Sequence, residues 1–190
     1  MNLKTYAIET FEIAEWNVLK AIFRLKPKDF EKQITENLNP IRWVIGHLTI
    51  HMDTIFNHLC LGERKLDKNF REYFLLGPDR TKQREFPVSY KELIDKFLEF
   101  FKISVDYLHN LPEDKFTELP ENNKGNNTET VAELIQRISL HFLGHTGQVY
   151  QVKRELGKGG TFVMGVKKKN RDDSRAKWLI WWNKNKDLYE

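Results

Sequence analysis

The sequence predicts an all-α fold, and three observations support this prediction. Apolar residues recur at intervals of three and four through four long segments, which is the period of an amphipathic helix. Three of these segments begin with residues that favour a helix N-terminus. The alternation of apolar and polar residues that indicates a strand is almost absent from the 190 residues. We therefore expect a four-helix bundle with polar connections and a C-terminal extension.

The first predicted helix covers residues 3–24. Its apolar positions follow a helical period: Leu3, Tyr6, Ala7, Phe11, Ala14, Val18, Ile22 and Phe23. We expect this helix to end near Pro27, because proline does not continue a helix. Residues 27–35 are expected to form a short helical turn.

The second predicted helix begins with Asn39 as N-cap and Pro40 at its first position, and it runs to about Leu59. Its apolar face consists of Ile41, Val44, Ile45, Leu48, Met52, Ile55, Phe56 and Leu59. Three histidines lie within about 40° of one another along one border of this face: His47, His51 and His58.

Residues 61–88 are expected to connect the second and third helices, because they are charged and interrupted by Gly77-Pro78 and Pro87. Connections of this length are usually functional or cross over between distant elements. The third helix begins with the capping-box pattern Ser89-Tyr-Lys-Glu92 and extends to about Leu108.

The fourth predicted helix carries a histidine pair. It begins with a second capping-box pattern, Thr130-Val-Ala-Glu133, and closes near Gly157. His141 and His145 lie one turn apart, at the edge of its apolar arc and inside it. Two imidazoles four residues apart on a helix can bind one metal ion.

We expect residues 1–157 to form the bundle domain and residues 158–190 to pack on it or on a partner subunit. The extension contains a short extended piece at 161–166 and a final amphipathic helix. Residues 165–190 contain eight Lys or Arg and four Asp or Glu, which accounts for the whole net charge of +4.

Basic residues beside Trp178, Trp181 and Trp182 also occur in proteins that bind nucleic acid. However, Asp172 and Asp173 interrupt the basic run, and the overall charge is modest. Tryptophans at this spacing more often form a packed helix face. We therefore do not expect nucleic acid as a partner, and the exposed aromatics favour a homodimer.

Composition narrows the class of protein. A hydrophobic content of 40% with 13% aromatic residues is typical of a folded globule. The single cysteine, Cys60, cannot form an intrachain disulfide, which favours a reducing compartment and hence the cytoplasm. We expect Cys60 to be a core residue. The sequence has neither a signal-peptide pattern nor an apolar run of about 18 residues, so we expect no leader and no membrane association.

A metal site requires more than the pair on the fourth helix. Transition-metal sites take three or four protein ligands, and the second helix offers His47 or His51 as the third. Three imidazoles with open positions suit zinc, nickel or iron. Such an ion acidifies a bound water or deprotonates a thiol. No Asp or Glu on the predicted core faces stands out as a general base. The alternative is that each histidine is satisfied by a backbone carbonyl or a neighbouring acid.

Two short motifs carry a family resemblance. Trp43-Val-Ile-Gly-His47-Leu and His141-Phe-Leu-Gly-His145-Thr-Gly-Gln148 resemble the DinB-like family of metal-dependent four-helix proteins, over residues 1–157. The resemblance implies that His47, His141 and His145 bind a divalent metal. It also implies an up-down-down-up bundle with a long crossover between helices two and three, which the 61–88 connection fits. Some relatives are thiol-dependent transferases or isomerases, and many have no known reaction.

We therefore expect a metalloenzyme that activates water or a thiol against a small-molecule substrate, of hydrolase or thiol-dependent transferase type. His51 and Gln148 are the candidates for substrate contact. Two other interpretations stay open: His51 is an ordinary residue at the surface edge, and Gln148 satisfies a buried polar atom. The alternative function is a helical interaction module, with or without metal, that has no catalytic activity.

Overall fold

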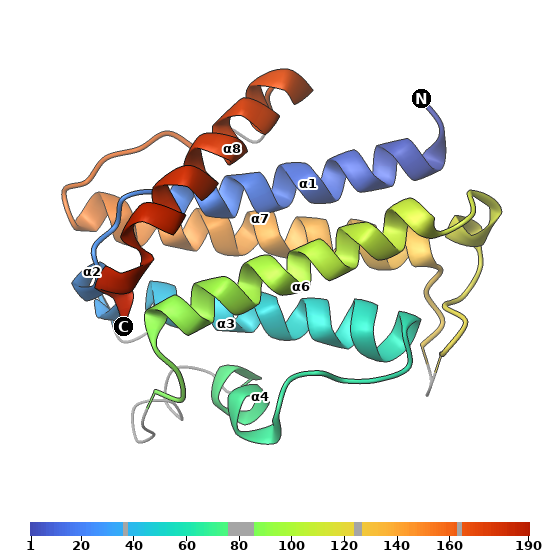
Figure 1. Ribbon diagram of the computed structural model, residues 1–190, viewed down its shortest axis with the longest axis horizontal. Helices are drawn as coiled ribbons and strands as arrows, with labels where there is room; N and C mark the ends of the chain where they lie inside the picture. The colour runs from blue at the N-terminus through green and yellow to red at the C-terminus, as the bar shows by residue number, and fades with distance from the viewer. Residues whose placement is uncertain (36–37, 76–85, 124–126, 163–164) are drawn as a thin grey trace.

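The computed structural model describes residues 1–35, 38–75, 86–123, 127–162 and 165–190 (Figure 1). Within these ranges there are seven α-helices and no strand, so the all-α prediction is confirmed. Four long helices lie side by side in Figure 1: α1 (Leu3–Ile22), α3 (Ile41–Met52), α6 (Tyr90–Asn110) and α7 (Val131–Glu155). α1 packs mainly on α7, and α3 packs on α6.

The centre of this arrangement is aromatic. Phe11 of α1 is fully buried, and its ring centroid lies 5.1 Å from that of Phe101 on α6 and 5.7 Å from that of Phe142 on α7. Phe56 lies 5.3 Å away on the segment that continues α3. Tilted ring pairs at these separations add to the free energy gained by burying apolar area. The four longest segments therefore share one core.

The second helix differs from the prediction at its start. α3 begins at Ile41, with Pro40 as N-cap, so the prediction of Asn39 as N-cap is wrong by one residue. Pro40 has an extended backbone (φ −64°, ψ 153°), and its carbonyl accepts from the N–H groups of Trp43 and Val44. Since proline has no N–H to lose and its carbonyl already serves the helix, it can occupy the cap itself.

The same segment also changes its winding. Asp53–Cys60 is a π-helix, η1, rather than a continuation of α3. The buried carboxylate of Asp53 accepts from the backbone N–H of Lys65 at 2.9 Å and from the amide of Asn57 at 3.1 Å. Because a π-helix has more residues per turn than an α-helix, the angular alignment predicted for His58 does not hold beyond residue 52.

The predicted connection 61–88 contains a helix that the sequence reasoning missed. α4 (Lys68–Leu75) buries Phe70, Tyr73 and Phe74 against the bundle. Its packing on α3 depends on Gly46, because a Cβ at that position would lie 2.3 Å from the ring of Phe74. Residues 76–85, including the predicted interruption Gly77-Pro78, lie outside the described residues.

Two further helix starts lie at the predicted capping residues, and the full reciprocal capping box forms at the second of them. The side chain of Ser89 accepts from the backbone N–H of Glu92 at the start of α6. Thr130 and Glu133 cap α7 reciprocally, which satisfies two N–H groups that have no partner within the helix. Short helices complete the fold: α2 (Pro27–Glu31), η2 (Asp114–Thr117) and η3 (Lys186–Tyr189).

The C-terminal extension forms α8 (Lys168–Asn185), which crosses α1 diagonally in Figure 1. Trp178 and Trp182 are buried within this chain, and the indole N–H of Trp182 donates to Asp95 of α6 at 2.7 Å. The short extended piece predicted at 161–166 includes residues 163–164, which are not described, and residues 161–162 form no strand.

Two ion pairs join α8 to α1. Arg171 bonds Glu12 at 2.6 Å, and Arg175 bonds both carboxylate oxygens of Glu15 at 3.1 and 3.2 Å. Glu15 has no exposed surface, and burial raises its pKa to about 7 although Arg175 opposes the shift. Glu15 and Asp53 are thus buried acids that the sequence reasoning did not single out, and both accept hydrogen bonds from other residues of the chain.

None of the described helices is long and apolar enough to cross a membrane.

The contact between α3 and α4 generates a test. Gly46→Ala places a methyl group inside the space of the Phe74 ring, so we expect it to lower the free energy of unfolding by about 1–3 kcal/mol. Chemical denaturation measures the change. The matched control is Gly144→Ala, a helical position where an added Cβ meets nothing within 4 Å. There we expect a gain of about 0.5–1 kcal/mol, because alanine favours the helix. Equal effects at both positions would contradict the proposed packing.

Candidate metal centre

Three histidines from two helices meet in the structure. His47 on α3 and His141 and His145 on α7 each place one ring nitrogen within 4.8 Å of the other two. The ring centroids lie 4.5 Å apart for the α7 pair and 4.9 and 5.2 Å from His47. All three side chains are partly buried. The sequence-predicted set therefore comes together, although its segments are separated by more than 90 residues.

Two of these rings are held in a defined tautomer. Nδ1 of His47 lies 2.9 Å from the carbonyl oxygen of Phe74, and Nδ1 of His145 lies 2.9 Å from the side-chain oxygen of Gln148. Because both partners accept hydrogen bonds, each Nδ1 carries the proton, and each Nε2 keeps a free lone pair. Histidines that bind metals usually have an acceptor at the other ring nitrogen. Trp43 stacks on His47 at 4.4 Å, which further restricts that ring.

The third ring has an unsatisfied atom. Nε2 of His141 is buried, and no hydrogen-bond partner for it exists among the described residues. A buried polar atom without a partner costs about 1–3 kcal/mol. A cation bound between the three rings would use this lone pair together with the two oriented Nε2 atoms. The donor set therefore fits a divalent transition metal.

Electrostatics keep the cluster neutral. Burial lowers the pKa of His47 and of His141 to about 4, and it lowers the pKa of His145 as well. Neighbouring imidazoles and the charge of Arg137 act in the same direction on His141. At neutral pH the rings are therefore unprotonated, which is the form that coordinates metals.

His51 lies beside the group without belonging to it. Its ring centroid is 4.2 Å from that of His141 and 4.6 Å from that of His47. Burial, followed by the charges of His141 and His47, lowers its pKa to about 3. Of the two candidates for the third ligand, the three-nitrogen group includes His47 and leaves His51 as a neighbour.

The two remaining histidines of the chain do not join the centre. His58 is partly buried and His109 is exposed, and neither belongs to the three-nitrogen group. Cys60 is 3% exposed, and burial raises the pKa of its thiol to about 11, so it is a core residue and a poor nucleophile.

Sequence reasoning missed the acceptor for His47, because the carbonyl belongs to the overlooked helix α4. A signal was present: Phe70, Tyr73 and Phe74 have the i, i+3, i+4 spacing of a short helix that packs on a neighbour. Gln148 contacts His145 directly, which agrees with the interpretation that it satisfies a buried polar atom.

The low pKa of His51 has a consequence for stability. The pKa of His51 in the folded protein, about 3, lies below the ordinary value of 6.5. The contribution of its neutral ring to the free energy of unfolding is therefore complete above about pH 6.5, and it is lost as the pH falls towards 3. In metal-free protein with chelator, we expect His51→Asn to lose less unfolding free energy than wild type between about pH 6.5 and 4.5. The difference should be about 1 kcal/mol after allowance for partial exposure. His109→Asn, at an exposed position, should behave as wild type. Parallel curves for all three proteins would contradict the burial of a neutral ring.

One comparison with known proteins found a match. A family model described as the DinB superfamily matches residues 10–149, which include α3, most of α7 and all three histidines of the candidate metal centre. No curated protein and no solved structure matches the chain. The match covers well over half of the 190 residues, so the chain belongs to the DinB superfamily.

Proposed function

We propose that the protein is a metalloenzyme in which His47, His141 and His145 hold a divalent ion that activates water or a thiol against a small-molecule substrate. The observation that carries the proposal is the set of three imidazole nitrogens within 4.8 Å of one another. The acceptors at the Nδ1 atoms of His47 and His145, and the unpartnered Nε2 of His141, support the same role.

Zinc, nickel and iron suit three neutral imidazoles that leave coordination positions open. An ion of this kind lowers the pKa of a water molecule or a low-molecular-weight thiol towards neutrality. The chain supports this chemistry by partly burying the rings, which keeps them unprotonated. A hydrolase or a thiol-dependent transferase is the reaction class that we propose.

His51 is the residue that we propose for substrate contact. Its neutral ring lies against two of the proposed ligands, so a substrate at the centre would be within reach of its ring nitrogens. Such a ring can accept a proton or a hydrogen bond. Gln148 has a supporting role in this proposal, because its side-chain oxygen is engaged with His145. We propose that it contacts substrate only through its remaining amide group.

The proposal also includes an up-down-down-up bundle over residues 1–157, with a long crossover between α3 and α6. The packing of α1 on α7 and of α3 on α6 supports this order.

We further propose a homodimer, supported by exposed Tyr6 and Leu140 beside a groove between α1 and α7. One cysteine in the chain supports a reducing compartment such as the cytoplasm.

Metal content tests the centre. Protein purified without an affinity tag should contain about one transition-metal ion per chain, and His141→Ala should lose it, because two imidazoles rarely retain such an ion. Elemental analysis under matched conditions measures the stoichiometry. His109→Ala, at an exposed histidine on α6, should keep the wild-type content. Metal that is absent from wild type, or retained in His141→Ala, would disprove the proposed ligand set.

Catalysis needs a separate measurement. A panel of thiols with electrophiles, and a second panel of esters and amides, should yield a turnover that chelation abolishes and metal restores. His51→Asn should lower kcat while metal content stays at one ion. Metal without turnover in any panel would favour the non-catalytic interaction module.

Gln148 gives a sharper test of ligand orientation. Gln148→Leu removes the acceptor for Nδ1 of His145, so we expect metal affinity to fall by about 10–100-fold. Competition with a chromophoric chelator measures the affinity. Gln151→Leu, at an exposed position on the same helix, is the control and should leave affinity unchanged. Equal affinities for the two variants would exclude an orienting role.

A further inference from the structure

One sizeable cavity of the described residues lies away from the histidines. It is a groove of about 480 Å³ between the C-terminal half of α1 and α8, and it shares no residue with the candidate metal centre. Ligand sites for small molecules commonly have volumes of about 300–1,000 Å³. The groove therefore has room for a small organic molecule.

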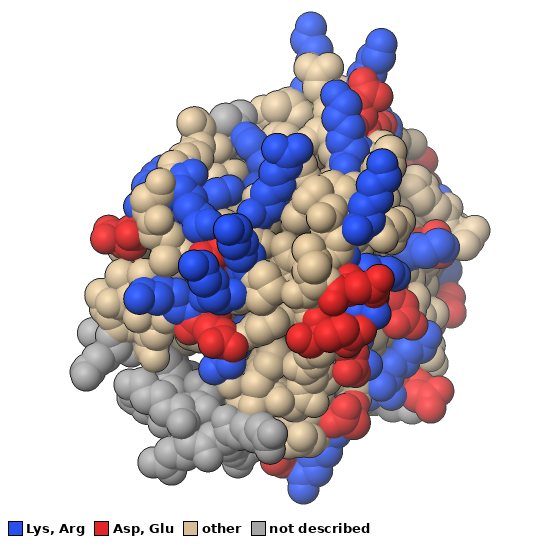
Figure 2. Space-filling model, turned by 60° about the vertical axis from the view of Figure 1, so that its left-hand side comes forward, with Lys and Arg blue, Asp and Glu red and all other residues tan. Residues whose placement is uncertain are grey.

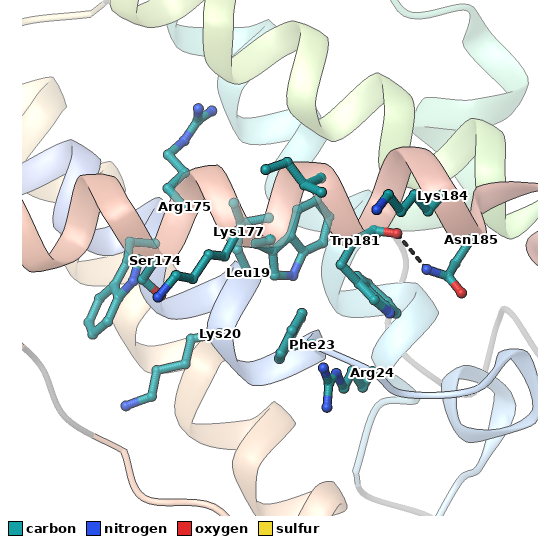
Figure 3. Close-up of a pocket in the computed structure, with 13 residues that line it drawn as sticks. Leu19, Lys20, Phe23, Arg24, Ser174, Arg175, Lys177, Trp181, Lys184 and Asn185 are labelled. Carbon is teal, nitrogen blue, oxygen red and sulfur yellow. Dashed lines mark hydrogen bonds between the residues drawn. The ribbon is translucent and has the colours of Figure 1, made fainter.

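Its lining combines an apolar surface with positive charge. The apolar part comes from Trp16, Leu19, Phe23, Trp178, Ile180 and Trp181. The charged part comes from five cationic side chains: Lys20, Arg24, Arg175, Lys177 and Lys184. No acidic residue lines the groove in the described part of the chain. In Figure 3, Trp181 extends from α8 towards Phe23 and Arg24, which directly follow α1.

Most of these cations are uncompensated. Arg175 is paired with Glu15, but Lys20, Arg24, Lys177 and Lys184 make no ion pair with a described carboxylate. Figure 2 brings the end of the molecule that lies on the left in Figure 1 forward. It shows one cluster of Lys and Arg side chains in the upper left of the face, whereas the basic side chains on the right lie among most of the acidic ones. Uncompensated cations over an apolar floor favour an anion that carries an apolar body.

Two buried donors in the same groove point to an acceptor. Trp16 is 4% exposed and Trp178 is 3% exposed, and the indole Nε1 of each has no acceptor among the described residues. The ammonium of Lys20 lies 5.2 Å from the ring centroid of Trp16, so a flexible side chain stands over that ring. A ligand carboxylate that displaced the lysine side chain from the ring would accept a hydrogen bond from an indole N–H. It would also form charge-assisted hydrogen bonds with the lysine ammonium groups.

The backbone at Arg24 supports a role for its side chain. Arg24 has φ +59° directly after α1, a left-handed conformation at a position where helices usually place glycine. Arginine in this conformation is strained, and its guanidinium lies at the rim with Phe23, at 5.0 Å from that ring.

We propose that the groove between α1 and α8 binds a small organic anion with a flat apolar body, whose carboxylate is held by the groove lysines, Arg24 and an indole N–H. The site is independent of the metal centre. A single-stranded nucleic acid is the less favourable occupant, because Trp16 and Trp178 are buried and do not offer their faces for base stacking.

The test uses three naphthalene compounds that share one ring system: naphthoate, naphthamide and naphthylmethylammonium. Calorimetry on the full-length protein should show saturable one-to-one binding of naphthoate. Naphthamide should bind at least about tenfold more weakly, since it lacks the charge-assisted hydrogen bonds. The ammonium compound should not bind.

Matched variants locate the binding. Lys177→Glu with Lys184→Glu should weaken naphthoate about tenfold or more. Lys65→Glu with Lys169→Glu, which changes the net charge equally at exposed positions outside the groove, should not. Arg24→Gly should weaken binding while raising the melting temperature by about 2 °C. His141→Ala should bind naphthoate as wild type does, which separates this result from any failure of the metal centre.

Several results would overturn the proposal. These are absent or non-saturable naphthoate binding, equal affinity for naphthoate and naphthamide, and an equal loss of naphthoate affinity in the two double lysine variants. Displacement of naphthoate by a short oligothymidylate at lower concentration would identify the groove as a nucleic-acid surface instead.

Discussion

The hydrogen bond from His47 to the carbonyl of Phe74 is the interaction on which the arrangement of the candidate metal centre depends most directly. It ties a ring on α3 to the backbone of α4, and α4 can approach only because Gly46 has no side chain. One glycine thus connects helix packing with the orientation of an imidazole. Glycine inside a helix weakens that helix, but at position 46 the close contact with Phe74 requires it.

The same logic applies to the other side of the cluster. Gln148 lies one turn from His145 on the same helix, and its side-chain oxygen accepts the hydrogen bond from Nδ1 of His145. The carbonyl oxygen of Phe74 has the same role for Nδ1 of His47. One acceptor is local in sequence and the other is not. Both leave Nε2 available, and desolvation keeps the rings neutral, so the cluster is arranged for a ligand role before any ion is considered.

The extension contributes a second level of organisation. α8 is joined to α1 by Arg171 with Glu12 and by Arg175 with Glu15, and Trp178 and Trp182 bury apolar area beneath it. A fully buried acid such as Glu15 is costly unless it is paired, so the extension compensates a charge that α1 places inside the molecule. The tail is therefore part of the folded structure, and it forms one wall of the cationic groove.

Sequence by itself determined the helical class, the helix starts at Ser89 and Thr130, and the pairing of His141 with His145, because periodicity, capping and i, i+4 spacing are local properties. The choice of His47 over His51 as the third histidine came from the family resemblance of its motif. Only the tertiary structure decided the rest. No local pattern encodes three of its features. These are the π-helical winding after Met52, the packing of α4 against Gly46 and the pairing of Glu15 with Arg175. The groove between α1 and α8 arises in the same way, since its two walls lie about 150 residues apart and meet only when the core is packed.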